Sequence, residues 1–316
     1  MLPILVLGFV RLESLKATIE SILAQEHGPI YVSCDAPPSQ YQEKGIEVHN
    51  YINSLLYSGK VQEVRISTSH EGILTGVSNG ISWFFDRVGI GIILEDDLVL
   101  QFDLLKSVEL ASNFLGDPRV VAIGLHNHVP NKFIGSKRNV LRSSRFVISW
   151  GWVTSKEHWN TRIRTYGEVD YVKLFFKMTP LIGISSSLYH LYYYRRRVRV
   201  ERTNLINCTW ADLWQINAFM KGLKVLTYNK NFIEYIGHGE FASNTIARSA
   251  ESKYPVEKIT ESELDSNNFS FEIGNIDRRA DRYYTKNRRV STIIRSKLSL
   301  GTILNFNSKF NLKFNR

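Results

Sequence analysis

The chain has 316 residues, of which 43% are apolar, so it can bury a large core as one big domain or two small ones. Disordered and fibrous classes are excluded by this composition. The net charge of +10 is uneven: residues 277–316 carry eleven Lys and Arg against two Asp, a net +9, which leaves +1 for residues 1–276. A nearly neutral body without a nucleic-acid-binding motif argues against nucleic acid as a partner.

The first 125 residues alternate short apolar runs with helical periodicity, a pattern typical of parallel strands joined by crossover helices. The expected strands are 4–8, 29–35, 61–66, 89–94 and 120–124, and the expected helices are 12–25, 41–57, 76–88 and 102–115. The run 89–94 shows no alternation, which indicates a strand buried on both faces. Three acidic residues, Glu95, Asp96 and Asp97, follow it directly.

Beyond residue 124 the pattern is looser. We expect a strand over 146–153 interrupted by a glycine, helical pieces over 155–195, a helix over 210–221 and a strand over 224–228. The short apolar start of the chain predicts a first strand rather than a signal peptide, and no stretch is long enough to span a membrane. Two cysteines favour a reducing compartment.

Ligands of an open parallel sheet bind outside the carboxyl ends of its strands. Gly8 to Arg11, Asp35 and the acids 95–97 are expected at that edge. Adjacent carboxylates are costly to desolvate, and Mg²⁺ or Mn²⁺ would offset this cost. The alternative is a solvated acidic turn with a helix cap. Likewise, Asp35 either accepts hydrogen bonds from a pyrimidine base or forms a turn, and Arg11 either pairs with a phosphate or is a surface charge.

The segment Ile93 to Leu100, with its acidic triplet, resembles the Asp-X-Asp region of nucleotide-sugar glycosyltransferases of the GT-A fold. It is similar in particular to the N-acetylglucosaminyltransferase that initiates complex N-glycans and to bacterial O-antigen and capsule glycosyltransferases. Three further motifs share this resemblance: Trp150-Gly151-Trp152, Trp210-Ala-Asp-Leu-Trp214 and the loop 231–240. The resemblance, with gaps, covers residues 3–245.

The resemblance implies an α/β protein with a Rossmann-like, mostly parallel central sheet flanked by helices. Residues 1–125 would bind the nucleotide-sugar, 126–250 would form the acceptor-binding and catalytic half of the same domain, and 251–316 would be a C-terminal extension. The enzyme would be inverting and metal-dependent, moving a sugar, with a UDP-sugar favoured, to a glycan or lipid-linked saccharide in bacterial surface polysaccharide synthesis.

The resemblance also implies roles for single residues. Asp97 would bind Mn²⁺ or Mg²⁺, and Asp212 would be the general base. The donor would contact Gly8, Phe9, Arg11, Asp35, Glu95 and Asp96, and the sugar pocket would contain Trp150, Gly151, Trp152 and His238. The two tryptophans point to the same side if 146–153 is a strand. The alternatives are a solvent-facing helix position for Asp212, core packing for the tryptophans and a capped loop position for His238.

Two basic segments of the sequence suggest binding to anionic surfaces or phosphates. Residues 278–316 mix eleven basic residues with apolar ones, which suits a segment lying on an anionic membrane, on its cytoplasmic face. A disordered or oligomer-forming extension is the alternative. The arginines of 195–202 either bind phosphates or form a solvated helix face. Two other functions stay open: a sugar nucleotidyltransferase, and a non-enzymatic module that binds nucleic acid or membranes.

Overall fold

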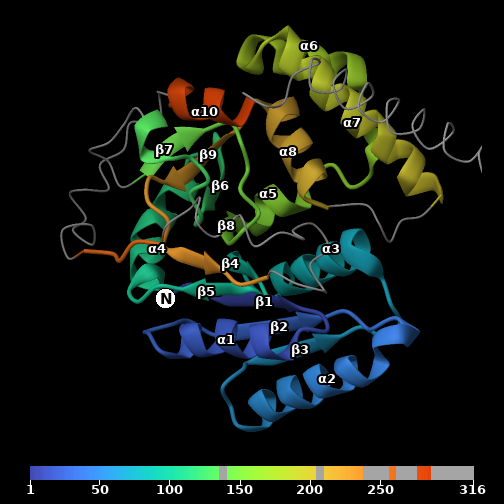
Figure 1. The fold of residues 1–316 in the computed structure, drawn as a ribbon, viewed down its shortest axis with the longest axis vertical. Helices are drawn as coiled ribbons and strands as arrows, with labels where there is room; N and C mark the ends of the chain where they lie inside the picture. Colours follow the sequence, from blue (N-terminus) through green and yellow to red (C-terminus); the bar gives the residue numbers. More distant parts are fainter. Residues whose placement is uncertain (135–140, 204–209, 238–255, 261–275, 286–316) are drawn as a thin grey trace, which may run out of the picture.

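A computed structural model describes residues 1–134, 141–203, 210–237, 256–260 and 276–285. Its centre is an eight-stranded sheet in the order β3-β2-β1-β4-β8-β6-β9-β7 (Figure 1). The strands are β1 (Ile4–Gly8), β2 (Ile30–Cys34), β3 (Glu63–Ile66), β4 (Ile90–Glu95), β6 (Val120–Gly124), β7 (Leu141–Ser144), β8 (Trp152–Ser155) and β9 (Lys224–Tyr228). Strands β7 and β8 run antiparallel to their neighbours and the other pairings are parallel. The predicted α/β class with a mostly parallel sheet is confirmed.

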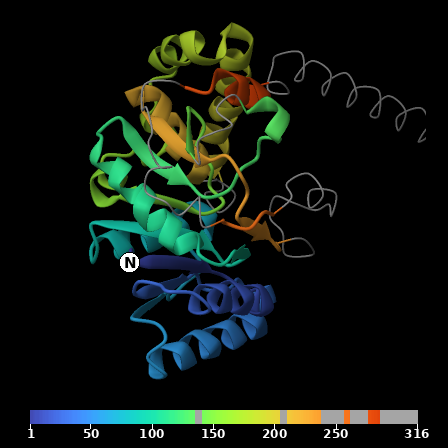
Figure 2. The same cartoon turned by 90° about the vertical axis from the view of Figure 1, so that its left-hand side faces the viewer.

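Helices cover both faces of this sheet, because successive side chains of each strand point to opposite faces. Ile4 and Val6 of β1 belong to one core, and Leu5 and Leu7 belong to the other. The first core is covered by α1 (Leu12–Leu23), α2 (Gln42–Tyr57) and α4 (Leu104–Ser112), and the second by α3 (Gly72–Phe85), α5 (Lys156–Asn160), α6 (Tyr171–Ile182), α7 (Ile184–Thr203) and α8 (Trp210–Lys221). Helix α2 lies at one end of the molecule, and α6 and α7 lie at the other (Figures 1 and 2).

The strand order reverses at β1, which is where a ligand crevice is expected in a doubly wound sheet. The chain moves outward from β1 to β2 and β3 and then returns to the other side of β1 as β4. The register pairs Gly8 with Cys34 and Leu7 with Glu95. The residues that follow β1, β2 and β4 therefore meet at one edge of the sheet.

A second, two-stranded sheet lies beside this edge. Strand β5 (Leu98–Leu100) pairs antiparallel with β10 (Ile233–Tyr235), and the Ile236 N–H donates to the Asp97 carbonyl at 3.0 Å. The pairing joins a segment near residue 235 to the acidic triplet, although more than 130 residues separate them in the chain.

Two element boundaries differ from the prediction for reasons of tertiary structure. Helix α3 begins at Gly72 rather than at 76, because Asp35 accepts hydrogen bonds from the N–H groups of Glu71 and Gly72. Strand β8 begins only at Trp152, because Gly151 has φ +71°, a conformation that ends an extended segment and favours glycine.

The C-terminal segment begins with a helix that packs against the body. Ile276 bridges to Ser143, and α10 (Arg278–Thr285) follows, with Ala280 and Asp281 buried. This helix belongs to the folded body, and the expectation that the segment from 278 onward lies on a membrane stays a prediction for these eight residues. Residues 286–316, and with them the rest of that prediction, lie outside the described residues. Within the described part of the chain, no helix combines the length and apolarity needed to cross a membrane.

Candidate functional site

Two buried aspartates and one arginine meet at the reversal point of the sheet. Asp96 and Asp97 follow β4 and are 1% and 2% exposed. Arg11, which follows β1, places Nη1 at 2.7 Å from Asp97 Oδ2 and pairs through Nη2 with Asp96 Oδ1. The Phe9 N–H donates to Asp96 Oδ2 at 3.1 Å. The structure thus brings Phe9, Arg11, Asp96 and Asp97 together, as predicted for a donor site, while their roles stay predictions.

The electrostatics of this cluster favour an added cation. Burial raises the pKa of Asp96, and Arg11 offsets only part of that rise. Burial, together with Asp97 and Asp96, also raises the pKa of the neighbouring Glu95. Burial lowers the pKa of Arg11, but the two aspartates more than reverse this effect, so the guanidinium is charged. Two ionised aspartates against one guanidinium leave a net negative charge in a buried place, which a divalent cation would neutralise.

The donor atoms fit a metal that is shared with a substrate rather than one held by the protein alone. Among the described residues, no group of three or more His, Cys, Asp or Glu side chains could hold an ion. Mg²⁺ and similar cations often take only one or two carboxylates together with substrate phosphates, and Asp97 and Asp96 match that number. Gly237 lies against this pair: a Cβ there would be 2.1 Å from Asp97 Oδ2, so a larger residue would fill the space beside the carboxylate.

Asp35 lies at the same edge but is engaged in local structure. Its oxygens accept from the Glu71 and Gly72 N–H groups at 3.0 and 2.9 Å, and His70 Nδ1 is 3.0 Å from Oδ2. This geometry is that of a cap on α3 supplied from a distant part of the chain, which is neither of the two roles considered for Asp35 from the sequence. Binding of a base by Asp35 stays a prediction.

Next to this cap, the rings of Phe9 and His70 stack with centroids 5.6 Å apart. They form a flat aromatic pair at the ends of β1 and β2, close to the acidic pair, since Phe9 also donates its N–H to Asp96. Gly8, the last residue of β1, is partly exposed there. A purine or pyrimidine could stack on such a surface.

A second aromatic group flanks the acidic pair on the side of β10. The ring of Trp150 lies parallel to that of Tyr235, with centroids 4.2 Å apart and an interplanar angle of 8°. His126 and His128, which follow β6, lie 4.9 and 4.7 Å from the Trp150 ring. Burial and the neighbouring His128 lower the pKa of His126 well below its usual value, so this imidazole is neutral at pH 7.

Trp152 is separate from this group. It is 1% exposed and packs among Trp159, Trp210 and Trp214 in the second core, whereas Trp150 packs against the first. The prediction that Trp150 and Trp152 point to the same side is therefore wrong, because 146–151 is not a strand and Gly151 has φ +71°.

Core packing, the alternative considered for the tryptophans, is what the structure shows for Trp152. Gly151 is also explained by protein packing: a Cβ there would lie 2.8 Å from the side chain of Ile233 in β10. The missing side chain of Gly151 thus allows β10 to pack closely against this segment. A role of either residue in a sugar pocket stays a prediction.

Asp212 lies in the first turn of α8, with its side chain 35% exposed. The Arg197 Nε and the Tyr166 hydroxyl are each 3.4 Å from its Oδ2. The start of α8 is fixed near the end of β4, because Trp210 stacks on Trp152, which pairs with Ile93. Asp212 is thus a partly exposed carboxylate at the start of a helix, and its role as general base stays a prediction.

His238 lies outside the described residues. The sequence singled out its loop through Gly237-His238-Gly239, and β10 brings the start of that loop to Asp97. Tyr235 and His70 were missed, because a single tyrosine in a three-residue strand and a single loop histidine carry no distinctive spacing. Their proximity to the site depends on contacts far apart in the chain.

Neither a protein-family model nor a curated protein sequence matches this chain. Similar solved structures include S. aureus TarS 1-349, with 11% identity over 70% of this chain and 71% of that one and a TM-score of 0.41. Mannosyltransferase PcManGT from Pyrobaculum calidifontis, in complex with GDP-Man and Mn²⁺, has 10% identity over 69% of both chains and a TM-score of 0.37. GalNAc-T7 with UDP, GalNAc and Mn²⁺ has 13% identity over 74% of this chain and 43% of that one, with a TM-score of 0.38.

Proposed function

We propose that this chain is a metal-dependent glycosyltransferase of the GT-A fold, which transfers a sugar from a nucleotide diphosphate donor to a saccharide acceptor. The observation that carries this proposal is the buried cluster of Arg11, Asp96 and Asp97 at the carboxyl ends of β1 and β4. Buried acids at the reversal point of the sheet suit a metal bound to a diphosphate, and an adjacent arginine suits the diphosphate itself.

Each residue of the cluster has a task in donor binding. Asp97, with Asp96, would hold Mn²⁺ or Mg²⁺, which when bound stabilises the negative charge of the leaving diphosphate. Arg11 lies within reach of both carboxylates and thus of a phosphate placed beside them. The stacked Phe9 and His70 offer a surface for the base, for which uracil is favoured.

Asp212 is proposed as the general base. It takes the proton of the acceptor hydroxyl while the oxygen attacks the anomeric carbon from the face opposite the diphosphate, which inverts the configuration. Arg197 would keep Asp212 ionised before the acceptor binds, since a cation at 3.4 Å favours the charged carboxylate. Trp150, stacked on Tyr235 beside the acidic pair, would contact a sugar ring. We extend the proposal to bacterial surface polysaccharides as the acceptor class.

A sugar nucleotidyltransferase is less well supported. Such an enzyme would carry a long phosphate-binding loop after its first strand, whereas β1 and α1 are joined here by residues 9–11 alone. So short a connection leaves little room to bind the triphosphate group of a nucleoside triphosphate substrate.

Thermal unfolding with a panel of nucleoside diphosphates, with and without Mn²⁺, tests donor binding. A true donor nucleotide should raise Tm, and Mn²⁺ should increase the shift. Asp97→Asn should remove the part that depends on Mn²⁺, while Asp117→Asn, whose carboxylate pairs with Arg119 in the turn before β6, should not. A nucleotide shift that is the same with and without Mn²⁺ contradicts the metal assignment. With an accepted donor, the anomeric configuration of the product, read by NMR, distinguishes inversion from retention.

A further inference from the structure

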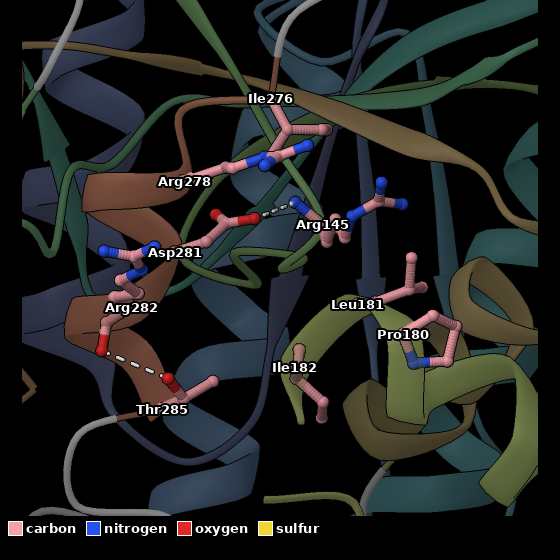
Figure 3. Close-up of a pocket in the computed structure, with 9 residues that line it drawn as sticks. All are labelled: Arg145, Pro180, Leu181, Ile182, Ile276, Arg278, Asp281, Arg282 and Thr285. Carbon is pink, nitrogen blue, oxygen red and sulfur yellow. Dashed lines mark hydrogen bonds between the residues drawn. The ribbon is translucent and has the colours of Figure 1, made fainter. Parts of the chain in front are cut away.

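A second pocket lies far from the acidic pair, between α6 and α10. It has a volume of about 340 Å³ and is lined by Arg145, Arg278 and Arg282, by Asp281, and by apolar residues that include Pro180 and Leu181. Figure 3 shows α10 on one side and the end of α6 on the other, with Arg278 reaching from α10 toward Arg145. The pocket borders β7, which ends the sheet four strands away from β4.

The pocket holds more positive than negative charge. None of its three guanidinium groups forms a hydrogen bond or ion pair with another described residue. Its one carboxylate, Asp281, already accepts from Ser144 Oγ at 2.6 Å and from the Arg145 N–H at 3.1 Å. Burial lowers the pKa of Arg145, Asp281 offsets part of this effect, and Arg278 adds to it, so a bound anion would further stabilise the charged guanidinium.

The exposed face of α6 leads to this pocket. Val172 and Phe176 are each 69% exposed, and Pro180 continues their row at the same spacing of four residues. Lys173 and Lys177, also exposed, follow the two apolar residues in the sequence. An exposed apolar row flanked by lysines, ending at a pocket whose guanidinium groups pair with none of the described residues, is unusual for a face that meets only water.

We propose that this pocket and the exposed face of α6 together bind an anionic phospholipid of a membrane surface. The phosphate group enters the pocket between Arg145 and Arg278, while Val172 and Phe176 enter the interfacial layer and the lysines contact neighbouring headgroups. The arginines match the charge of the phosphate, and the apolar row matches the layer beneath it. A soluble phosphate compound would leave that row without a partner.

The position of the surface agrees with the rest of the chain. Thr285, the last described residue, also lines the pocket, so the segment 286–316 is attached at this place. That segment contains eight Lys and Arg and no acidic residue. The sequence analysis placed membrane contact in residues 278–316; the proposed surface shares α10 with that segment and adds the exposed face of α6.

Flotation of the full-length protein with vesicles tests the proposal. Vesicles of phosphatidylcholine alone are compared with vesicles that also contain phosphatidylglycerol. Two variants probe the two parts of the surface, Arg145→Gln/Arg278→Gln and Val172→Ser/Phe176→Ser. Since each surface charge contributes roughly 1 kcal/mol, loss of two arginines should weaken binding to the anionic vesicles about 30-fold. The serine variant should weaken it by about the same factor or more.

Matched controls lie on other elements than α6 and α10. Lys60→Gln/Lys106→Gln removes two exposed charges, and Ile46→Ser/Tyr57→Ser removes two exposed apolar groups of α2, without expected effect. Each variant should keep the Tm of the parent and its shift with nucleotide and Mn²⁺, which separates this proposal from the proposed enzymatic function. Arg278→Gln alone serves if the double variant is unstable, since this side chain is exposed.

Three outcomes overturn the proposal. Binding that is equal in parent and both variants shows that the surface does not contact the membrane. If millimolar inorganic phosphate or glycerol phosphate displaces the protein from the vesicles, and the serine variant binds the vesicles as the parent does, the pocket binds a soluble anion instead. Equal binding to vesicles with and without phosphatidylglycerol shows that the surface does not select an anionic lipid.

Discussion

Replacement of Arg11 by glutamine should show how strongly the acidic pair depends on a cation. The side chain keeps its approximate length, but Asp96 and Asp97 lose their shared positive partner while both remain buried. Removing one member of a buried ion pair typically costs about 3–5 kcal/mol, because the remaining charge is desolvated and unpaired. We expect a loss of this size in the free energy of unfolding at pH 8.

The loss should depend on pH with a definite sign. Burial raises the pKa of Asp96, and Arg11 counteracts that rise, so the variant raises this pKa further. The folded variant then holds more protons than the folded parent, and its stability falls relative to the parent as pH increases. At pH 5, where protonation removes part of the unpaired charge, the difference between parent and variant should be smaller than at pH 8.

Urea unfolding followed by tryptophan fluorescence measures both effects, with and without Mn²⁺. The metal should stabilise the variant more than the parent, because Arg11 no longer occupies Asp97 Oδ2. Arg87→Gln is the control: its pair with Glu63 is exposed, at 31% and 43%, and should cost less than about 1 kcal/mol. A penalty for Arg11→Gln that is below this value, or equal at pH 5 and pH 8, would refute the reasoning.

Three other substitutions probe separate parts of the structure. Gly237→Ala places a Cβ at 2.1 Å from Asp97 Oδ2 and should lower transferase activity about 100-fold by displacing that carboxylate. Gly89→Ala, where a Cβ would meet nothing within 4 Å, should leave the activity unchanged, and equal activities of the two variants would contradict the contact. Asp281→Asn should gain up to about 3 kcal/mol relative to the parent between pH 4 and pH 7, since burial raises the pKa of Asp281 to about 6, and parallel stability curves would exclude this. Asp212→Asn should abolish transfer yet keep the Tm shift with donor nucleotide; a lost shift would make Asp212 a donor-binding or structural residue.

The sequence predicted those elements that local periodicity defines. Helix α1 repeats apolar residues at Leu15, Ile19 and Ile22, all of which are buried, and β4 is an unbroken apolar run between β1 and β8. Strands β5 and β10 escaped prediction, because three residues are too few to show an alternation. Their pairing is nevertheless what places Gly237 beside Asp97.

For the site, the sequence located the acids but not their partners. A sheet edge is predictable from the order of strands and helices, so Arg11 and the acids 95–97 could be assigned to it. That Arg11 pairs with both Asp96 and Asp97, and that Asp35 caps α3, depends on side-chain positions across the crevice. The opposite orientations of Trp150 and Trp152 depend on one backbone angle, that of Gly151.

Strand β8 has a consequence for how the chain can be divided. It comes from the segment 126–250, yet it lies between β4 and β6 and is hydrogen-bonded to both. A fragment that ends at residue 125 would contain β4 and β6 but lack the strand that pairs with both of them. The complementary fragment would contain β8 but neither of its partner strands. The two halves of the sequence are thus one unit of cooperative unfolding, and separate expression of the donor half should give a protein that folds only when the other fragment is supplied.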